Sequence, residues 1–448
     1  MAIKMKTATF PRGGVHLPEL KDRTKALPLE RPPAPARVAV LMGQHAGAPA
    51  TPVVRKRERV RKGQLLGRAQ GHVSANVHSP VSGTVEAIEP RIYNLTGLRV
   101  PAAIIANDGL EKWAAGTNEP QDVEGMEAAR MVELVRDCGV VGLGGAAFPS
   151  HVKLSPPAGM PITDVFVNGT ECEPYVTVDH RLMLERTADV VDGLRLIMRI
   201  VKAANGYVAI ERNKPDAIEA LGKAVEGDPD IRVVPFKVRY PQGAEHQIIT
   251  AVTGREVPSD GGLPAAVGCL VHNVATVLAI RDAVRFRRPL IERPITVTGD
   301  GIEEAGNLIE PIGASIADII ARQGVREGAN QLILGGPMMG VAQGVADVPL
   351  VKGNSAIVLL REAWIPLQRD CIRCGRCIEQ CPMGLVPGAI GFACESRDWN
   401  TASALGLLEC RECGCCAYVC PAKRPIVQMI KFGKSELRRK DEKAKPGR

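Results

Sequence analysis

The last fifth of the chain carries two copies of the motif C-x2-C-x2-C-x3-C-P. The copies are Cys371, Cys374, Cys377, Cys381 with Pro382, and Cys410, Cys413, Cys416, Cys420 with Pro421. Three cysteines at this spacing can bind three irons of a [4Fe-4S] cluster, and the cysteine before the proline usually binds the other cluster of the pair. We therefore assign Cys420 to the first copy's cluster and Cys381 to the second copy's cluster. The pair of motifs indicates single-electron transfer.

Structural zinc is the alternative for paired C-x2-C units, but a tetrahedral ion needs four ligands, whereas each copy offers three closely spaced cysteines plus a fourth. All eight histidines precede residue 273, so mixed cysteine and histidine ligation is not expected near the motifs. We predict two all-cysteine clusters. The other five cysteines are interpreted as small buried or half-buried residues: Cys138, Cys172, Cys269, Cys394 and Cys415.

A glycine-rich segment at residues 139–149, GVVGLGGAAFP, suggests a second kind of chemistry. Backbone N–H groups of such a loop can bind a phosphate, and Gly142-x-Gly144-x-x-Ala147 loosely matches the dinucleotide-binding fingerprint. The context differs, because a helical pattern precedes the loop and Pro149 follows it, whereas the fingerprint follows a strand and opens a helix. An ordinary Rossmann site is disfavoured, and a plain tight turn remains an alternative.

An acidic loop, NGTECEPY at residues 168–175, follows the end of an expected strand. Its carboxylates Glu171 and Glu173 could accept hydrogen bonds from the hydroxyl groups of a flavin side chain or a ribose. Acids on a solvated surface would look similar. Two further polar segments, YPQGAEH at 240–246 and HNVAT at 272–276, favour the binding site.

The elements that must position these residues fall into several modules. Residues 1–115 show short strands between glycine and proline turns, which predicts an all-β module with the flattened barrel of biotinyl and lipoyl carriers. Residues 75–83 contain no lysine that could be modified. Alternating strands and helices predict an α/β domain at 120–285. We expect its strands at 164–167, 206–210 and 231–238, and its helices at 244–252 and 265–284.

Two smaller modules follow. Residues 290–350 combine strands at 295–299 and 331–335 with a helix at 315–322, which suits a β-grasp-like unit. The cysteine motifs occupy 361–432. A basic segment at 433–448 is interpreted as a solvated, disordered tail that could touch anionic lipid or an acidic partner.

Composition excludes several function classes. The chain has 448 residues, which suggests about three domains. No stretch approaches about 18 apolar residues, so no membrane-spanning helix is expected. Aromatic residues are only 3% and the net charge is +8, without the interleaved basic and aromatic residues of a nucleic-acid-binding surface. The absence of an apolar signal segment, with eight of the thirteen cysteines in motifs, predicts the reducing cytoplasm.

Taken together and in this order, the four polar segments resemble the flavin-binding core of the 51 kDa subunit of respiratory complex I and its relatives. An opening segment FPRGGVHLPE at residues 10–19, a GGPMMG loop at 335–340 and the double cysteine motif extend the likeness. Residues 10–425 are thus similar to the RnfC family, the C subunits of Rnf complexes. The resemblance implies a multidomain α/β protein with a barrel-sandwich hybrid domain, a Rossmann-like FMN and NAD domain, a β-grasp (SLBB) module and a helical ferredoxin-type module with two clusters.

The same resemblance implies a function. FMN and two [4Fe-4S] clusters would exchange electrons with NAD(H) in a peripheral subunit on the cytoplasmic face of the cell inner membrane. Its partners would be the other subunits of a membrane complex, including a ferredoxin-like subunit, that couples ferredoxin:NAD oxidoreduction to ion movement. No catalytic side chain is expected, because a flavin itself converts hydride transfer into single-electron transfer.

Carried over by position, the glycine loop and Lys153 would hold the phosphate side of the flavin. Hydrogen bonds to the flavin would come from Asn168, Asn273 and Thr276. The carboxylates near the flavin and the nicotinamide ribose would be Glu171, Glu173 and Glu245. The loop lacks the arginine that the complex I subunit has between its glycines. The implied cofactor-binding residues are Gly142, Gly144, Gly145, Lys153, Asn168, Glu171, Glu173, Tyr240, Gly243, Glu245, Asn273 and Thr276.

Two alternatives stay open. One is a soluble flavin and iron-sulfur reductase of the corrin reductase type, against which the β module at the start of the chain argues. The other is a docking subunit without nucleotide chemistry of its own, like a related quinone-reductase subunit without clusters. Eight intact cysteines argue against the loss of the clusters, but not against the loss of the flavin.

Overall fold

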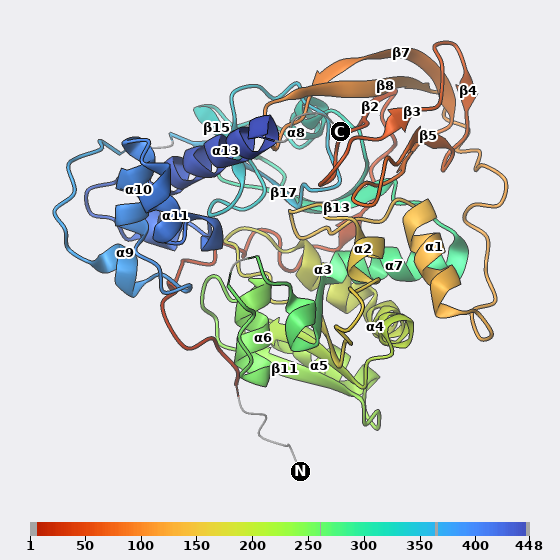
Figure 1. The fold of residues 1–448 in the computed structure, drawn as a ribbon. Coiled ribbons are helices and arrows are strands. Elements are labelled where there is room, and N and C mark those ends of the chain that lie inside the picture. The colour runs from red at the N-terminus through yellow and green to blue at the C-terminus, as the bar shows by residue number, and fades with distance from the viewer. Residues whose placement is uncertain (1–6, 260, 363–365, 445–448) are drawn as a thin grey trace.

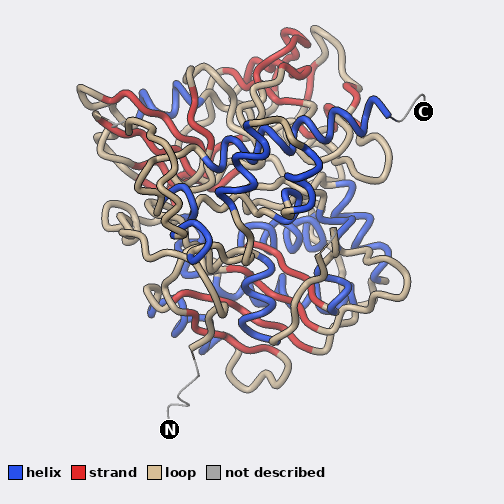
Figure 2. Tube along the Cα trace, turned by 60° about the vertical axis from the view of Figure 1, so that its left-hand side comes forward, coloured by secondary structure: helices blue, strands red, loops and turns tan. Residues whose placement is uncertain are grey.

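The structure is a computed structural model that describes residues 7–259, 261–362 and 366–444. Along the chain, an all-β part is followed by an α/β part, a mixed sheet and a helical part that carries the cysteine motifs (Figures 1 and 2). The all-β part and the cysteine motifs lie at opposite sides of the molecule in Figure 1.

The all-β part consists of two small sheets around one core. Their strand orders are β2-β8-β7-β4 and β3-β5-β6. Alternating side chains of both sheets, including Val38, Leu66, Val85 and Ile105, are buried together, as the sequence pattern predicted. The strands are β2 (Arg37–Leu41), β3 (Thr51–Pro52), β4 (Arg59–Val60), β5 (Leu65–Arg68), β6 (Val77–His78), β7 (Gly83–Ile92) and β8 (Arg99–Asn107).

A parallel sheet of order β11-β10-β9-β12 forms the centre of the α/β part. Because side chains alternate along a strand, Val165 and Val167 share a core with α1, α4 and α7, whereas Phe166 shares a core with Ile248 of α6 on the other face. The strands are β9 (Asp164–Asn168), β10 (Asn205–Glu211), β11 (Ile231–Phe236) and β12 (Cys269–Asn273). The helices are α1 (Ala128–Asp137), α2 (Ser150–Lys153), α3 (Val178–Glu185), α4 (Thr187–Val201), α5 (Pro215–Ala224), α6 (Glu245–Thr253), η1 (Pro264–Val267) and α7 (Val274–Phe286).

The predicted helix at 265–284 is wrong in its first part. The strand β12 occupies Cys269–Asn273, and α7 begins only at Val274. β12 pairs in parallel with β9, which sets Asn273 opposite Asn168. Two of the polar segments therefore meet at the carboxyl edge of the sheet, where open α/β sheets bind their ligands.

The third sheet has the order β1-β14-β13-β17-β15-β16. Its β13 is antiparallel to β14 and parallel to β17, and α8 buries Ile316 and Ile319 in its core. Two strands come from outside the range predicted for this module, namely β1 near the N-terminus and β17. The elements are β1 (Leu29–Glu30), β13 (Glu292–Thr298), β14 (Gly306–Pro311), α8 (Ile316–Arg322), β15 (Ala329–Leu334), β16 (Val341–Gln343) and β17 (Ala356–Arg361).

The cysteine motifs lie among short helices that share a core with Ile390, Leu407 and Ile430. The predicted disordered tail is wrong up to Ala444, because α13 continues to that residue. Residues 445–448 lie outside the described residues. The helices are α9 (Arg376–Glu379), α10 (Pro387–Glu395), α11 (Trp399–Ala404), η2 (Leu407–Glu409), α12 (Cys415–Tyr418) and α13 (Ile426–Ala444). Among the described helices, none has the length and apolarity needed to cross a bilayer.

Candidate functional site

The glycine loop forms a closed turn between α1 and α2. The Gly142 N–H donates to the carbonyl oxygen of Phe148 at 2.8 Å, which closes its base. At its tip, Gly144, Gly145 and Ala146 are exposed. Gly145 has a φ of +110°, and a Cβ added there would meet no atom within 4 Å. The tip therefore offers exposed backbone without side chains in the way of a ligand.

This loop is attached to the carboxyl edge of the parallel sheet. The Leu143 N–H donates to Thr276 Oγ1 at 2.8 Å, and a Cβ added at Gly144 would lie 3.4 Å from that of Asn273. Asn273 also caps α7, since its Oδ1 accepts from the Ala275 N–H at 2.9 Å. The structure thus brings together two predicted site segments at the N-terminus of a 13-residue helix, a position that favours anions.

The 240–246 segment joins the same edge. Asn168 Nδ2 donates to the Gly243 carbonyl oxygen at 2.8 Å. A Cβ at Gly243 would lie 2.6 Å from Thr170 Oγ1, so glycine is required for this close approach. Glu245 begins α6, and its Oε1 accepts from Lys153 Nζ at 3.0 Å, with both side chains partly exposed. The cation of Lys153 and the carboxylate of Glu245 are therefore paired beside the carboxyl edge of the sheet.

Glu171 and Glu173 are directed elsewhere. Glu171, with a φ of +47°, accepts from the Asp179 N–H at 2.6 Å and so supports the start of α3. Glu173 accepts from the N–H groups of Met338 and Met339 at 3.0 and 2.9 Å, in the GGPMMG loop. Burial raises the pKa of each carboxyl to about 7. Both side chains are engaged with backbone groups, unlike the half-exposed Glu245.

Sequence reasoning missed Arg293, which lies beneath the glycine loop. Arg293 belongs to β13 and is fully buried; its Nη2 donates to the Leu143 carbonyl oxygen at 2.6 Å, and its Nε donates to the carbonyl oxygen of Asn354. Nη1 has no partner in the described residues. Burial lowers the pKa of Arg293 to about 10, opposed by the carboxylate of Asp179. Asp179 in turn accepts from Asn273 Nδ2 at 2.5 Å.

The two cysteine motifs have the same backbone conformation. Arg373 and Glu412, two residues after the first cysteine of each copy, both have a φ of 55°. The glycines two residues further, Gly375 and Gly414, have φ values of 77° and 83°. The first sulfur of each copy accepts from the N–H of Arg373 or Glu412 at 3.4 Å. These matched turns direct N–H groups towards sulfur, as iron-sulfur sites require.

The first three cysteines of the first copy, Cys371, Cys374 and Cys377, line a cavity of about 300 Å³ together with Cys420 from the second copy. No group of three or more histidine, cysteine or acidic side chains in the described ranges is placed to hold a single metal ion. The four sulfurs lie around a space rather than at one point. They fit a ligand with the dimensions of a cluster better than one tetrahedral ion.

The other four motif cysteines form a second group. Burial raises the pKa of Cys416, and the neighbouring thiols Cys413, Cys410 and Cys381 raise it further. Burial also raises the pKa of Cys410, with Cys413 and Cys381 contributing. Cys381 is therefore close to the second copy.

Tyr240 connects this second group to the α/β part. Its Oη donates to the Cys413 carbonyl oxygen at 2.8 Å, and its side chain is buried with Val15 and Cys415. Arg411 Nη2 lies 2.7 Å from His246 Nε2. The predicted site residue Tyr240 thus lies at the boundary with the cysteine motifs rather than at the glycine loop.

Comparison with known proteins agrees with this arrangement. Residues 9–110 match the family model described as the RnfC barrel sandwich hybrid domain, and residues 135–282 match the Nuo51 FMN-binding domain. The chain is 43% identical to the C subunit of the proton-translocating ferredoxin:NAD(+) oxidoreductase complex of Clostridium ljungdahlii, over 97% of this chain and 95% of that protein. This chain belongs to the RnfC family.

Other members of the RnfC family match at similar levels. The C subunit of the Na(+)-translocating ferredoxin:NAD(+) oxidoreductase complex of Acetobacterium woodii is 41% identical, over 97% of this chain and 98% of that protein. The C subunit of the ion-translocating oxidoreductase complex of Rhodobacter capsulatus is 41% identical, over 95% of this chain and 83% of that protein. A solved NAD+-reducing [NiFe]-hydrogenase in the H2-reduced state aligns at a TM-score of 0.49 and 17% identity, over 69% of this chain and 62% of that chain, which is too low to assign a fold.

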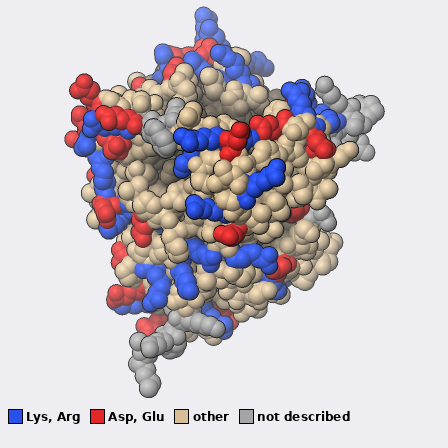
Figure 3. All heavy atoms as spheres, turned by 90° about the vertical axis from the view of Figure 1, so that its left-hand side faces the viewer, with Lys and Arg blue, Asp and Glu red and all other residues tan. Residues whose placement is uncertain are grey.

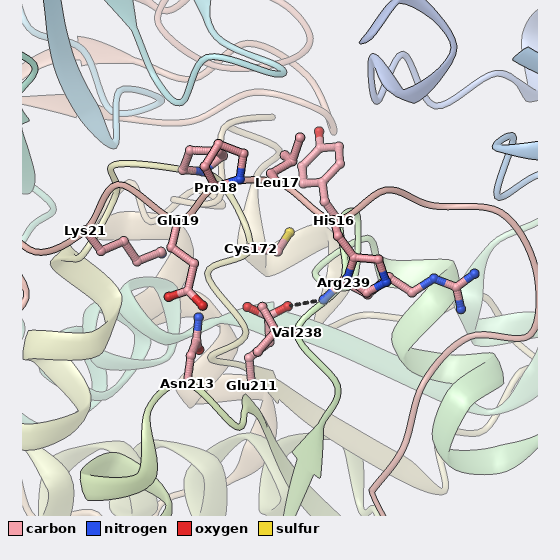
Figure 4. Close-up of a pocket in the computed structure, with 12 residues that line it drawn as sticks. His16, Leu17, Pro18, Glu19, Lys21, Cys172, Glu211, Asn213, Val238 and Arg239 are labelled. Carbon is pink, nitrogen blue, oxygen red and sulfur yellow. Dashed lines mark hydrogen bonds between the residues drawn. The ribbon is translucent and has the colours of Figure 1, made fainter. Parts of the chain in front are cut away.

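A small pocket beside Tyr240 lies between the N-terminal segment and the α/β part (Figure 4). Its volume is about 30 Å³, and Glu19, Lys21, Cys172 and Glu211 are among the residues that line it. Glu211 Oε1 accepts from the Arg239 N–H at 3.2 Å, the dashed line in Figure 4. A space of this size holds about one water molecule and no flavin.

Proposed function

We propose that this chain passes electrons between NAD(H), FMN and two [4Fe-4S] clusters within an ion-translocating ferredoxin:NAD oxidoreductase complex. The observation that carries the proposal is the crosswise grouping of the motif cysteines, with Cys420 beside the first copy and Cys381 beside the second. The names of the RnfC relatives, and the match to an FMN-binding domain, support the same function.

The glycine loop and the carboxyl edge of the sheet would hold FMN. The exposed backbone of Gly144 and Gly145 and the N-terminus of α7 suit a phosphate, while Lys153 adds a cation at the rim. Gly142 and Thr276 keep the loop in place, and Asn168, Gly243 and Asn273 shape the edge beneath it. Glu245 is the carboxylate available to accept from a ribityl or ribose hydroxyl. When bound, FMN converts between hydride and single-electron transfer.

The side chains of this protein would hold the cofactors in position and shield them from solvent. Tyr240 and Glu173 tie the edge to the cysteine motifs and to the GGPMMG loop, and Glu171 supports α3 beside Asn273. The residues proposed to ligate iron are Cys371, Cys374, Cys377 and Cys420 for one cluster, and Cys410, Cys413, Cys416 and Cys381 for the other. Backbone N–H groups near the sulfurs would help to set the cluster potentials.

We further infer the assignment of modules. The barrel-sandwich hybrid domain would span 1–115, the FMN and NAD domain 120–285, an SLBB-type β-grasp 290–350 and the ferredoxin-type module 361–432. The order β14-β13-β17-β15 around α8 supports the β-grasp. The subunit would sit peripherally on the cytoplasmic face of the inner membrane, beside the other subunits of the complex, including a ferredoxin-like one.

Anaerobic reconstitution with iron, sulfide and FMN tests the proposal. The expected result is about eight irons and one FMN per chain, with bleaching of the flavin absorbance by NADH. Cys420→Ala should remove the same cluster signal as Cys374→Ala, and Cys381→Ala the same signal as Cys413→Ala. Cys394→Ala, a buried cysteine of α10 outside the motifs, is the matched control and should retain all the iron.

Other results would select an alternative. Eight irons without flavin would make the chain a cluster relay and docking subunit. One zinc ion per motif would overturn the redox assignment. Full cofactor loading with NADH-dependent reduction of a corrinoid, and no association with membranes, would favour the soluble reductase.

A further inference from the structure

The two groups of motif cysteines differ sharply in exposure. Cys371 and Cys374 are exposed, whereas Cys381 and Cys416 are buried. The buried group lies against the α/β part through Tyr240 and His246. The exposed group, which we call the outer group (Cys371, Cys374, Cys377 and Cys420), opens through its cavity to the surface at α9 and α10.

The surface around the outer group is unusually apolar. Ile372 is 69% exposed, and Ile378, Val386 and Phe392, which also line the cavity, are exposed. A monomer rarely leaves large apolar side chains grouped around a functional cavity unless another molecule covers them. Apolar anchors inside a polar rim are the usual composition of a protein interface.

Exposed basic residues on this surface outnumber its exposed acids, Asp370 and Glu379. Arg369, Arg373, Arg376 and Lys423 are exposed and, within the described residues, form no ion pair, while Arg424 pairs with Glu395 at 2.5 Å. Figure 3 shows the side of the molecule that carries α9 and α10, with both basic and acidic groups distributed over a largely uncharged surface. The second copy has Glu412 and Cys415 where the first has Arg373 and Arg376. The second copy therefore lacks the two arginines that the first copy has at these positions.

We propose that the outer face, made of Ile372, Arg373, Arg376 and Phe392, docks an acidic electron-carrier protein. This rests on the proposed function. One electron would pass between the outer cluster and the one-electron centre of the carrier, and no bond would form or break. Charge complementarity identifies the carrier as acidic, because unpaired arginines steer a protein with a carboxylate rim and repel a basic one. The buried group would then be the one that faces the flavin.

The test uses the full chain, reconstituted with FMN and iron, and an acidic bacterial ferredoxin as the probe. Stopped-flow mixing of reduced ferredoxin with the oxidised chain gives a second-order rate at low and at high ionic strength. The double variant Arg373→Glu/Arg376→Glu should lower the low-salt rate about tenfold or more and flatten its salt dependence. Glu412 already occupies the position equivalent to Arg373 at the same φ, so the loop accommodates this change.

Two further variants separate the contributions. Lys56→Glu/Arg61→Glu reverses two exposed charges on the all-β part and should leave the rate unchanged. Ile372→Ser should lower the rate while retaining the salt dependence, since it removes apolar contact without charge. Iron content and cluster spectra are measured for every variant, so a lost cluster is distinguished from lost docking.

Three outcomes would overturn the proposal. The first is an unchanged rate and salt dependence in the fully loaded double variant. The second is a faster rate after charge reversal, which would require a basic partner. The third is binding to vesicles of anionic phospholipid that the double variant abolishes without any effect on the ferredoxin rate, which would assign the face to a membrane. A chain that takes up no iron would overturn the proposed function and this inference together.

Discussion

A single buried arginine lies beneath the glycine loop, which has no charged residue of its own. Arg293 lies under Leu143 and faces Asp179, which holds Asn273 at the head of α7. A positive charge below the loop favours an anion above it, and low solvent access keeps that interaction strong. We therefore infer that Arg293 would support the proposed flavin site from a different sheet.

Replacing Arg293 tests this role. We expect Arg293→Met to weaken FMN binding about tenfold or more, because Asp179 loses its counter-charge and the Leu143 carbonyl loses its donor. A fluorescence titration with FMN measures the affinity, and iron analysis should show unchanged clusters. Arg288→Met, which removes a partly exposed arginine paired with Asp282, is the control. Equal FMN affinity in both variants, or iron loss in Arg293→Met, would contradict the role.

At the residue scale, chemistry could be predicted from spacing where the ligands are local. The cysteine motifs and the glycine loop are such cases. The directions of Glu171 and Glu173 could not be predicted, because a positive φ at Glu171 and a loop 165 residues further along the chain decide where these carboxylates point. Arg293 gave no signal, since its partners come from two other parts of the chain.

Among the elements, β12 shows how the sequence analysis failed. The residues CLVHN run directly into α7 with no turn residue between them, so apolar spacing alone extended the helix backwards over the strand. Only parallel pairing with β9 identifies Cys269–Asn273 as a strand. The error matters for the site, because that pairing is what sets Asn273 beside Asn168.

The last helix supports the second cysteine copy. Lys434 of α13 donates through Nζ to the Cys410 carbonyl oxygen at 2.6 Å and pairs with Glu412 at 2.7 Å. A cation near a cluster stabilises its reduced, more negative state. Lys434→Met should therefore shift one of the two cluster potentials more negative, on the order of 30–60 mV, and leave the other unchanged.

A redox titration followed by electron paramagnetic resonance measures this shift. Lys431→Met provides the matched control, because Lys431 lies one turn earlier on α13 and is exposed. Equal shifts of both potentials, or a shift in the control, would mean that Lys434 acts through the stability of the helix rather than through its charge.

On the scale of the molecule, the all-β part, the α/β part and the part with the mixed sheet meet at the glycine loop. Lys352, which follows the mixed sheet's β16, is buried and donates through Nζ to the carbonyl oxygens of Asn76 and Gly139 at 3.0 and 2.8 Å. Asn76 belongs to the all-β part, and Gly139 begins the loop. Burial lowers the pKa of Lys352 to about 7. The position of the glycine loop therefore depends on contacts from three parts of the chain, which no local pattern could reveal.

Solvent access differs between the two groups of motif cysteines, because Cys371 and Cys374 of one group are exposed whereas Cys381 and Cys416 of the other are buried. Iron released by an oxidant and a chelator should leave in two phases of about equal amplitude, the faster one from the exposed Cys371 and Cys374 side. Cys374→Ala should abolish the fast phase, and Cys413→Ala the slow phase, when release is followed by the colour of the chelated iron. A single phase, or loss of the slow phase in Cys374→Ala, would mean that solvent access does not distinguish the clusters. In the expected order of iron release, the outer group loses its iron first, and the buried group keeps its iron because Tyr240 covers it. A cluster that faces the proposed flavin site needs this protection.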